Sequence, residues 1–167
     1  MDRGYMNRTR SSQLGLTPIQ RAVLRRGGVA STAYLLALGN DWEWIKMGVD
    51  YGRLIKVCKG WWALPGIAEE VLEARRAGGV LACASALEFR GLRPEGSAAA
   101  LHVLVPHTAS RLPRATKSGQ PLVFHYSRRP ISRQGSVVCA PMALEQARRC
   151  AALMGESEDG HPSPSPT

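Results

Sequence analysis

The chain has 167 residues with 22 basic and 13 acidic side chains, a formal net charge of +9. Apolar residues make up 44% of it, which is enough for a packed core, and no run of about 18 apolar residues occurs. The composition therefore predicts no membrane-spanning helix. The first residues lack the apolar segment of a secretory signal, so a cytoplasmic protein is expected.

Basic charge is concentrated in two parts of the chain. Residues 1–30 hold six Arg against one Asp, and residues 101–149 hold eight basic residues against Glu145. Residues 31–74, in contrast, hold four basic and six acidic residues. Such a distribution would attract a polyanion at the first and the third of these segments. The alternative explanation is a general compositional bias toward Arg in the coding sequence, with no functional meaning for the charge.

The chain begins with a segment that has no apolar periodicity. Residues 1–15 are polar and basic, which predicts a flexible arm, or an arm that follows a nucleic-acid groove. A helix is predicted from Pro18, because Pro is favoured at the first helical position, and Gly27 is expected to end it.

Two short helices are predicted next. The first covers Val29 to Leu38, with Ser31 or Thr32 as its capping residue. The second covers residues 42–51 behind an Asp41 cap, and its inward face is formed by Ile45, Gly48 and Val49.

A two-stranded basic ribbon follows these helices. Apolar and polar residues alternate from Arg53 to Cys58, Lys59-Gly60 forms a tight turn, and residues 61–64 return. Three helices followed by a basic hairpin are typical of a winged helix-turn-helix.

The second half is predicted to mix helices with a small sheet. The expected helices cover residues 67–77, 80–87 and 142–153, and the last of them has Leu144, Ala147 and Ala151 on one face. The expected strands are 101–105, 122–126 and 135–139. In the helix 67–77, Glu69, Glu70 and Glu73 are expected on the polar side. The composition after Gly155 predicts disorder.

The run from Gly39 to Gly66 resembles the N-terminal domain of the AbiEi antitoxin family, which ends in a Gly-aromatic-Ala-Leu-Pro-Gly signature. Here that signature is Gly60-Trp61-Trp62-Ala63-Leu64-Pro65-Gly66. A weaker resemblance extends over roughly residues 16–153. It implies a bacterial or phage-borne antitoxin or transcriptional regulator that binds operator DNA, with a second domain that counters a nucleotidyltransferase toxin.

The residues expected to contact DNA lie on the helix-turn-helix and its wing: Ser31, Thr32, Trp42, Lys46, Arg53, Lys56 and Lys59. The last three match basic positions of the family. The exposed face of the second motif helix is Arg-rich in the family, but here the corresponding residues are Trp42, Glu43, Lys46 and Met47. Phosphates repel acidic residues, so this difference weakens DNA reading by the helix.

The difference supports an alternative function. The chain could be a phage or prophage interaction protein, such as an exclusion or inhibitor factor, that uses the same scaffold to bind a host protein. Its docking surface would then include Trp42, Glu43, Met47 and Trp61. On a purely structural interpretation, Trp44 and one of Trp61 and Trp62 fill the core.

We predict no enzymatic activity, cofactor or metal. The sequence contains no phosphate-binding loop, nucleophile elbow or metalloprotease motif, and the acid cluster of a nuclease domain is missing. Four widely spaced Cys predict reduced and mostly buried thiols. The His residues do not provide a zinc cluster, and His102 and His125 are expected to be ordinary polar residues on strand faces.

The predicted fold is α+β, with an N-terminal winged helix-turn-helix domain followed by a small mixed domain. The expected parts are a basic arm at 1–15, the winged domain at 16–66, the second domain at 67–153 and a disordered tail at 154–167.

Overall fold

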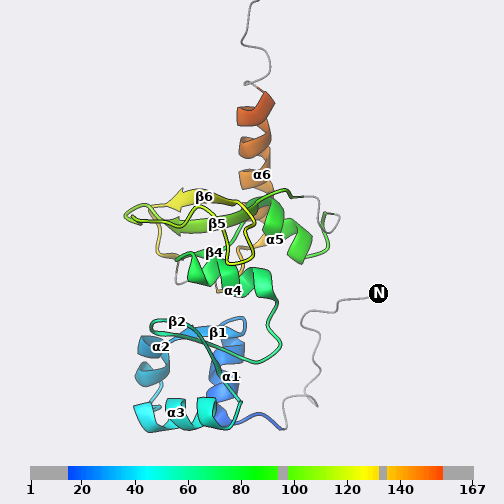
Figure 1. Ribbon diagram of the computed structural model, residues 1–167. Helices are drawn as coiled ribbons and strands as arrows, with labels where there is room; N and C mark the ends of the chain where they lie inside the picture. The colour runs from blue at the N-terminus through cyan, green and yellow to red at the C-terminus, as the bar shows by residue number, and fades with distance from the viewer. Residues whose placement is uncertain (1–14, 94–97, 132–134, 156–167) are drawn as a thin grey trace, which may run out of the picture.

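The computed structural model describes residues 15–93, 98–131 and 135–155. In these residues the chain is a mixed α+β protein, as the sequence predicted, with six helices and two three-stranded sheets. The elements from α1 to β3 form one lobe, and those from α4 to α6 form the other (Figure 1). Most of the predicted arm and tail, residues 1–14 and 156–167, lies outside the described residues.

The first lobe contains three helices and three short strands. In chain order these are α1 (Pro18–Arg25), β1 (Val29–Ser31), α2 (Thr32–Ala37), α3 (Trp42–Asp50), β2 (Ile55–Cys58) and β3 (Trp61–Ala63). The three strands form an antiparallel sheet in the order β1-β3-β2.

Side-chain caps start the three helices of this lobe. Thr17 and Gln20 form a reciprocal capping box at α1, where Pro18 occupies the first turn. The Ser31 hydroxyl accepts a hydrogen bond from the Tyr34 N–H, and the Asp41 carboxylate accepts one from the Trp44 N–H. These contacts confirm the predicted caps at Ser31 and Asp41.

The prediction that the helix begins at Val29 is wrong. Val29 and Ala30 lie in β1, which pairs with β3 from Val29↔Ala63 to Ser31↔Trp61. The helix starts only at Thr32, because tertiary strand pairing decides the conformation of the three preceding residues. The Lys59-Gly60 turn is confirmed, and Gly60 has the positive φ of 75° that favours glycine there.

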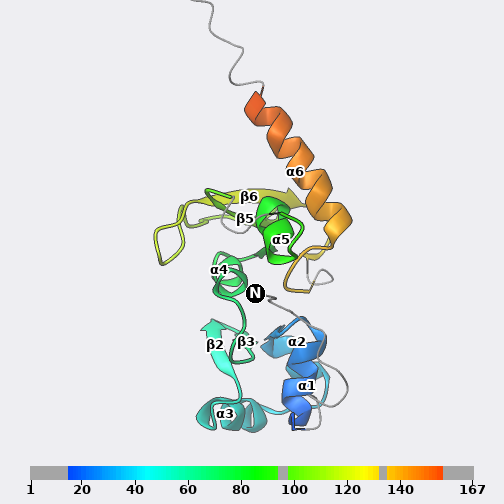
Figure 2. The ribbon, with the colours of Figure 1, turned by 90° about the vertical axis from the view of Figure 1, so that its right-hand side faces the viewer.

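The second lobe packs helices on a mixed sheet. Its elements are α4 (Glu69–Arg76), β4 (Val80–Leu81), α5 (Cys83–Phe89), β5 (Leu101–Pro106), β6 (Leu122–Ser127) and α6 (Ala140–Gly155). The strand order is β4-β5-β6, with β4 antiparallel and β6 parallel to β5. The α6 helix packs against α5 near its start and then projects away from the sheet (Figure 2).

Several predictions for this lobe are corrected. Val80–Leu81 form a strand, not the start of a helix, and residues 135–139 contribute only a bridge between Val137 and Leu81. Within residues 140–153 of α6, Ala143 is the buried residue, whereas Leu144 and Ala151 are exposed. The face of a helix is decided by what it packs against, and α6 packs on one side only.

The two lobes share part of their hydrophobic core. Val29, Val57 and Ala63 of the first lobe belong to the same buried cluster as Val71 and Leu101 of the second. A separate cluster around Leu35, Ile45 and Trp62 fills the first lobe. The packing is therefore continuous across the boundary that was placed between residues 66 and 67.

The tryptophans are distributed differently from the structural interpretation of the sequence. Trp62 is 6% exposed and fills the core of the first lobe, as expected for one of the Trp61-Trp62 pair. Trp44 is 58% exposed, so the prediction that it fills the core is wrong. Trp44 lies at the edge of the inward face of α3, and Ile45 and Leu54 fill the core at this point instead.

Candidate functional site

The outward face of α3 is polar and predominantly acidic. Ile45 and Gly48 point inward, and a Cβ on Gly48 would approach Leu54 Cδ1 to 3.0 Å. At 100° per residue this orientation places Glu43, Lys46 and Met47 outward, and all three are exposed. With its cap the helix carries three acids, Asp41, Glu43 and Asp50, against one base.

Trp42 flanks this face on the side of the first sheet. Its ring lies edge-on to Trp62, with centroids 5.9 Å apart, and more than half of its surface remains exposed. The Trp62 indole N–H in turn donates a 2.8 Å hydrogen bond to Thr32 Oγ1. The buried indole therefore connects α3 with α2 through side chains.

A groove lies on the other flank of α3, toward α1. It has a volume of about 480 Å³, and Trp44, Met47 and Tyr51 line it with Ile19 and Arg53 among others. The first three of these residues are large apolar or aromatic side chains with exposed surface. Contiguous apolar surface of this kind is typical of protein contact sites.

The hairpin of β2 and β3 presents basic side chains. Lys56 and Lys59 are exposed on it, and Arg53 is exposed just before it. Trp61 differs from these, because the Arg75 guanidinium covers its ring with Cζ 3.8 Å from the centroid. Trp61 is therefore partly buried by α4 and is less accessible to a partner than the sequence suggested.

Ser31 and Thr32, two of the predicted DNA contacts, have structural partners. Ser31 Oγ caps α2 and Thr32 Oγ1 accepts the bond from Trp62 Nε1. Both side chains are half-buried. The structure thus exposes Trp42, Lys46, Lys56 and Lys59 on one lobe. The hydroxyls of Ser31 and Thr32, in contrast, accept hydrogen bonds within that lobe.

A second group of polar side chains lies in the other lobe. Cys83, His102, His125 and Cys150 place one ligand atom each within 4.8 Å of all the others. They come from α5, β5, β6 and α6. The expectation that Cys and His are not clustered is therefore wrong, and His102 and His125 are not isolated polar residues.

The thiols also differ from the prediction. Cys83 is buried, but Cys58 and Cys150 are half-buried and Cys139 is exposed, and all four are free. Burial raises the pKa of Cys83 to about 12 and lowers the pKa of His125 to about 4, since desolvation disfavours the charged form of each group. Spacing along the chain gave no signal for this cluster.

No protein-family model matches the chain, and a search of curated proteins finds no match. In the part of the chain that the structure describes, no helix is both long and apolar enough to cross a bilayer.

Proposed function

We propose that the chain is an AbiEi-like antitoxin or transcriptional regulator of a bacterial or phage-borne toxin-antitoxin or phage-defence system. Its first lobe would act as a winged helix-turn-helix that binds duplex operator DNA. The main support is the element order α1-β1-α2-α3-β2-β3 together with the antiparallel sheet β1-β3-β2, which fits a winged motif. The second lobe would engage a nucleotidyltransferase toxin in the cytoplasm.

The charges of the first lobe favour binding to phosphates over reading of bases by α3. The outward face of α3 has more acids than bases, whereas the hairpin exposes Lys56 and Lys59. Lysine side chains on a hairpin bind the DNA backbone as point charges and position the protein without specifying a sequence. The affinity should then fall steeply with salt concentration, because each neutralised phosphate releases a counterion.

A mobility-shift titration on the chain's own upstream region tests this proposal. Lys56→Ala/Lys59→Ala should weaken binding and reduce the slope of log affinity against log salt by about 2, one for each phosphate contact. The matched control is Arg148→Ala/Arg149→Ala, which removes the same charge from α6, where both Arg already pair with Glu145. Absence of any shift at low salt, or equal losses in both variants, contradicts the proposal.

A second function is favoured by the exposed aromatic surface around α3. Trp42 and Met47 are exposed beside an acidic residue, Glu43, and Met47 also lines the apolar groove. Such a surface suits a protein partner, with the chain acting as an interaction protein on a host target. Trp42→Ala should then lower the affinity for that partner by about thirtyfold or more, as truncation of a buried interface tryptophan commonly does.

A pull-down from host lysate with folded variants separates the two functions. Loss of one captured protein in Trp42→Ala, with DNA binding unchanged, favours the protein partner. Lys117→Ala is a suitable control, since this exposed side chain lies in the other lobe, on the loop between β5 and β6.

A further inference from the structure

The four side chains Cys83, His102, His125 and Cys150 converge from separate elements of the second lobe. Cys83 is the first residue of α5 and Cys150 lies on α6, 67 residues further along the chain. His102 and His125 lie on neighbouring parallel strands, two residues apart in register, since His102 pairs with Val123 and Leu104 with His125. Two thiols and two imidazoles thus meet between the sheet and two helices.

The closest distances among these atoms are near those between ligands of one ion. Cys83 Sγ lies 3.7 Å from Cys150 Sγ, His102 Nδ1 lies 3.0 Å from His125 Nε2, and Cys150 Sγ lies 3.8 Å from His125 Nε2. In a tetrahedron with Zn–S of about 2.3 Å and Zn–N of about 2.0–2.1 Å, two sulfurs are about 3.8 Å apart and two nitrogens about 3.3 Å.

The sulfur separation excludes a covalent bond in this arrangement. A disulfide requires about 2.05 Å between its sulfurs, far less than the 3.7 Å between Cys83 and Cys150. Two thiolates would neutralise a dication, so the occupied site would carry no net charge in a half-buried environment. A borderline-soft ion with a tetrahedral preference suits two sulfur and two nitrogen ligands.

The surroundings hold the ligands in place. The Cys83 N–H donates to Gln146 Oε1 at 3.0 Å, and the His102 N–H donates to Ser85 Oγ at 3.0 Å. Cys83 also has a positive φ of 50° at the start of α5, which is unusual for a residue with a side chain. Gln146 lies on the same helix as Cys150, so one helix supplies both a ligand and a support.

We propose that Cys83, His102, His125 and Cys150 form a structural zinc site that fastens α6 to α5 and the sheet. With four protein ligands the coordination is complete, which is typical of a structural and not a catalytic ion. On binding, each thiol transfers its proton to solvent and each imidazole coordinates through a neutral nitrogen, so two protons are released per ion.

The first test measures metal in the full-length protein purified under reducing conditions from zinc-supplemented cells. We expect about one zinc per chain, and replacement by Co²⁺ should give the visible d–d bands of a tetrahedral site with thiolate-to-cobalt charge transfer. Protein that carries no zinc and takes up neither ion when titrated overturns the proposal, as does an octahedral cobalt spectrum.

Paired variants then assign the ligands. Cys83→Ser/Cys150→Ser and His125→Gln should lower zinc affinity by more than about a hundredfold in competition with a chelating dye. The matched controls, Cys58→Ser/Cys139→Ser and His107→Gln, remove the same groups outside the cluster and should retain one zinc. Circular dichroism identifies variants that do not fold, in which case the wild-type cobalt spectrum decides. Equal loss of zinc in the folded control variants would refute the assignment.

Discussion

The guanidinium of Arg75 lies over the ring of Trp61, with Cζ 3.8 Å from the ring centroid. This contact joins α4 of the second lobe to β3 of the first. Arg75 is buried, and desolvation is the main reason why its pKa falls to about 10, so it stays charged at neutral pH. A desolvated cation over an aromatic face contributes about 2 kcal/mol to stability.

Trp61→Ala should therefore lower the free energy of unfolding by about 2 kcal/mol or more, because it removes this contact and leaves the buried cation uncovered. Trp44→Ala is the matched control: Trp44 is largely exposed, so its loss should stay within about 0.5 kcal/mol. Urea unfolding of both variants measures the difference. Similar values for the two would show that the Arg75 contact adds nothing.

A second prediction concerns the hydrogen bond within the first lobe between Trp62 and Thr32. Thr32→Val keeps the shape of the side chain but removes the acceptor of the buried indole N–H, which should cost about 1–3 kcal/mol. Thr108→Val makes the same change at an exposed position and should be nearly neutral. Thermal unfolding followed by tryptophan fluorescence tests this; a neutral Thr32→Val would mean that the indole finds another acceptor.

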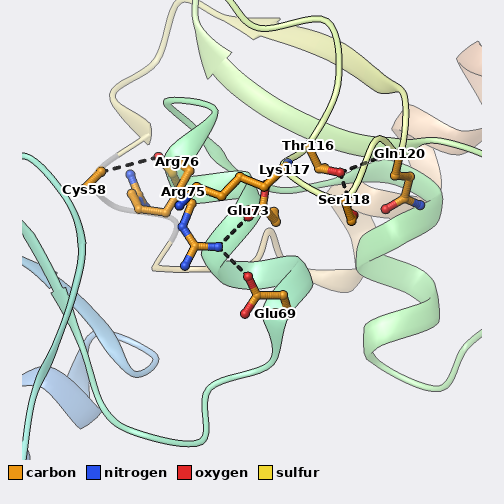
Figure 3. A network of polar contacts seen from close by, with 9 residues as sticks. All are labelled: Cys58, Glu69, Glu73, Arg75, Arg76, Thr116, Lys117, Ser118 and Gln120. Atoms are coloured by element: carbon orange, nitrogen blue, oxygen red, sulfur yellow. Dashed lines mark hydrogen bonds and ion pairs between the residues drawn. The ribbon is translucent and has the colours of Figure 1, made fainter. Parts of the chain in front are cut away.

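A third prediction concerns Glu73, which Figure 3 shows between Arg76 and the loop that carries Lys117. One carboxylate oxygen bonds Arg76 Nη1, and the other accepts the Lys117 N–H at 3.1 Å. Its side chain is 8% exposed, so the sequence-based placement on a polar helix face is wrong. Glu73→Ala should lower stability by about 1–3 kcal/mol, since Arg76 loses one of its two carboxylate partners and the Lys117 N–H loses its acceptor.

The control for this prediction is on the same helix. Glu69 bonds the same Arg76 nitrogen, but its side chain is 68% exposed, so Glu69→Ala should cost less than about 1 kcal/mol. Chemical denaturation of both variants gives the comparison. If Glu69→Ala were the more damaging change, solvent exposure would not determine the strength of these ion pairs.

A fourth prediction addresses the acidic face of α3. If the chain binds DNA there, Glu43→Arg should tighten binding and steepen its salt dependence by about 1, because an added cation neutralises one more phosphate. The control is Glu145→Arg, which makes the same change of charge on α6, away from this face. Equal tightening by both would indicate a general effect of net charge, and weaker binding by Glu43→Arg would argue against DNA at α3.

Local signals in the sequence were sufficient to predict the helix caps and the tight turn. The caps at Ser31 and Asp41 and the turn at Lys59-Gly60 depend on residues within four positions of one another, so the chain specifies them without tertiary packing. The strand at Val80–Leu81 was missed for the opposite reason. These two apolar residues adopt a strand conformation only because they pair with β5.

By itself, the sequence determined the mixed α+β composition of the fold, the helix caps at Ser31 and Asp41 and the basic hairpin, all of which follow from periodicity and short-range hydrogen bonds. The tertiary structure alone decided that Trp62 and not Trp44 is buried, that Glu73 faces the interior, and that Cys83 meets Cys150. Those relationships join residues far apart in the chain. They exist because paired strands and packed helices fix distances in space that spacing along the sequence does not encode.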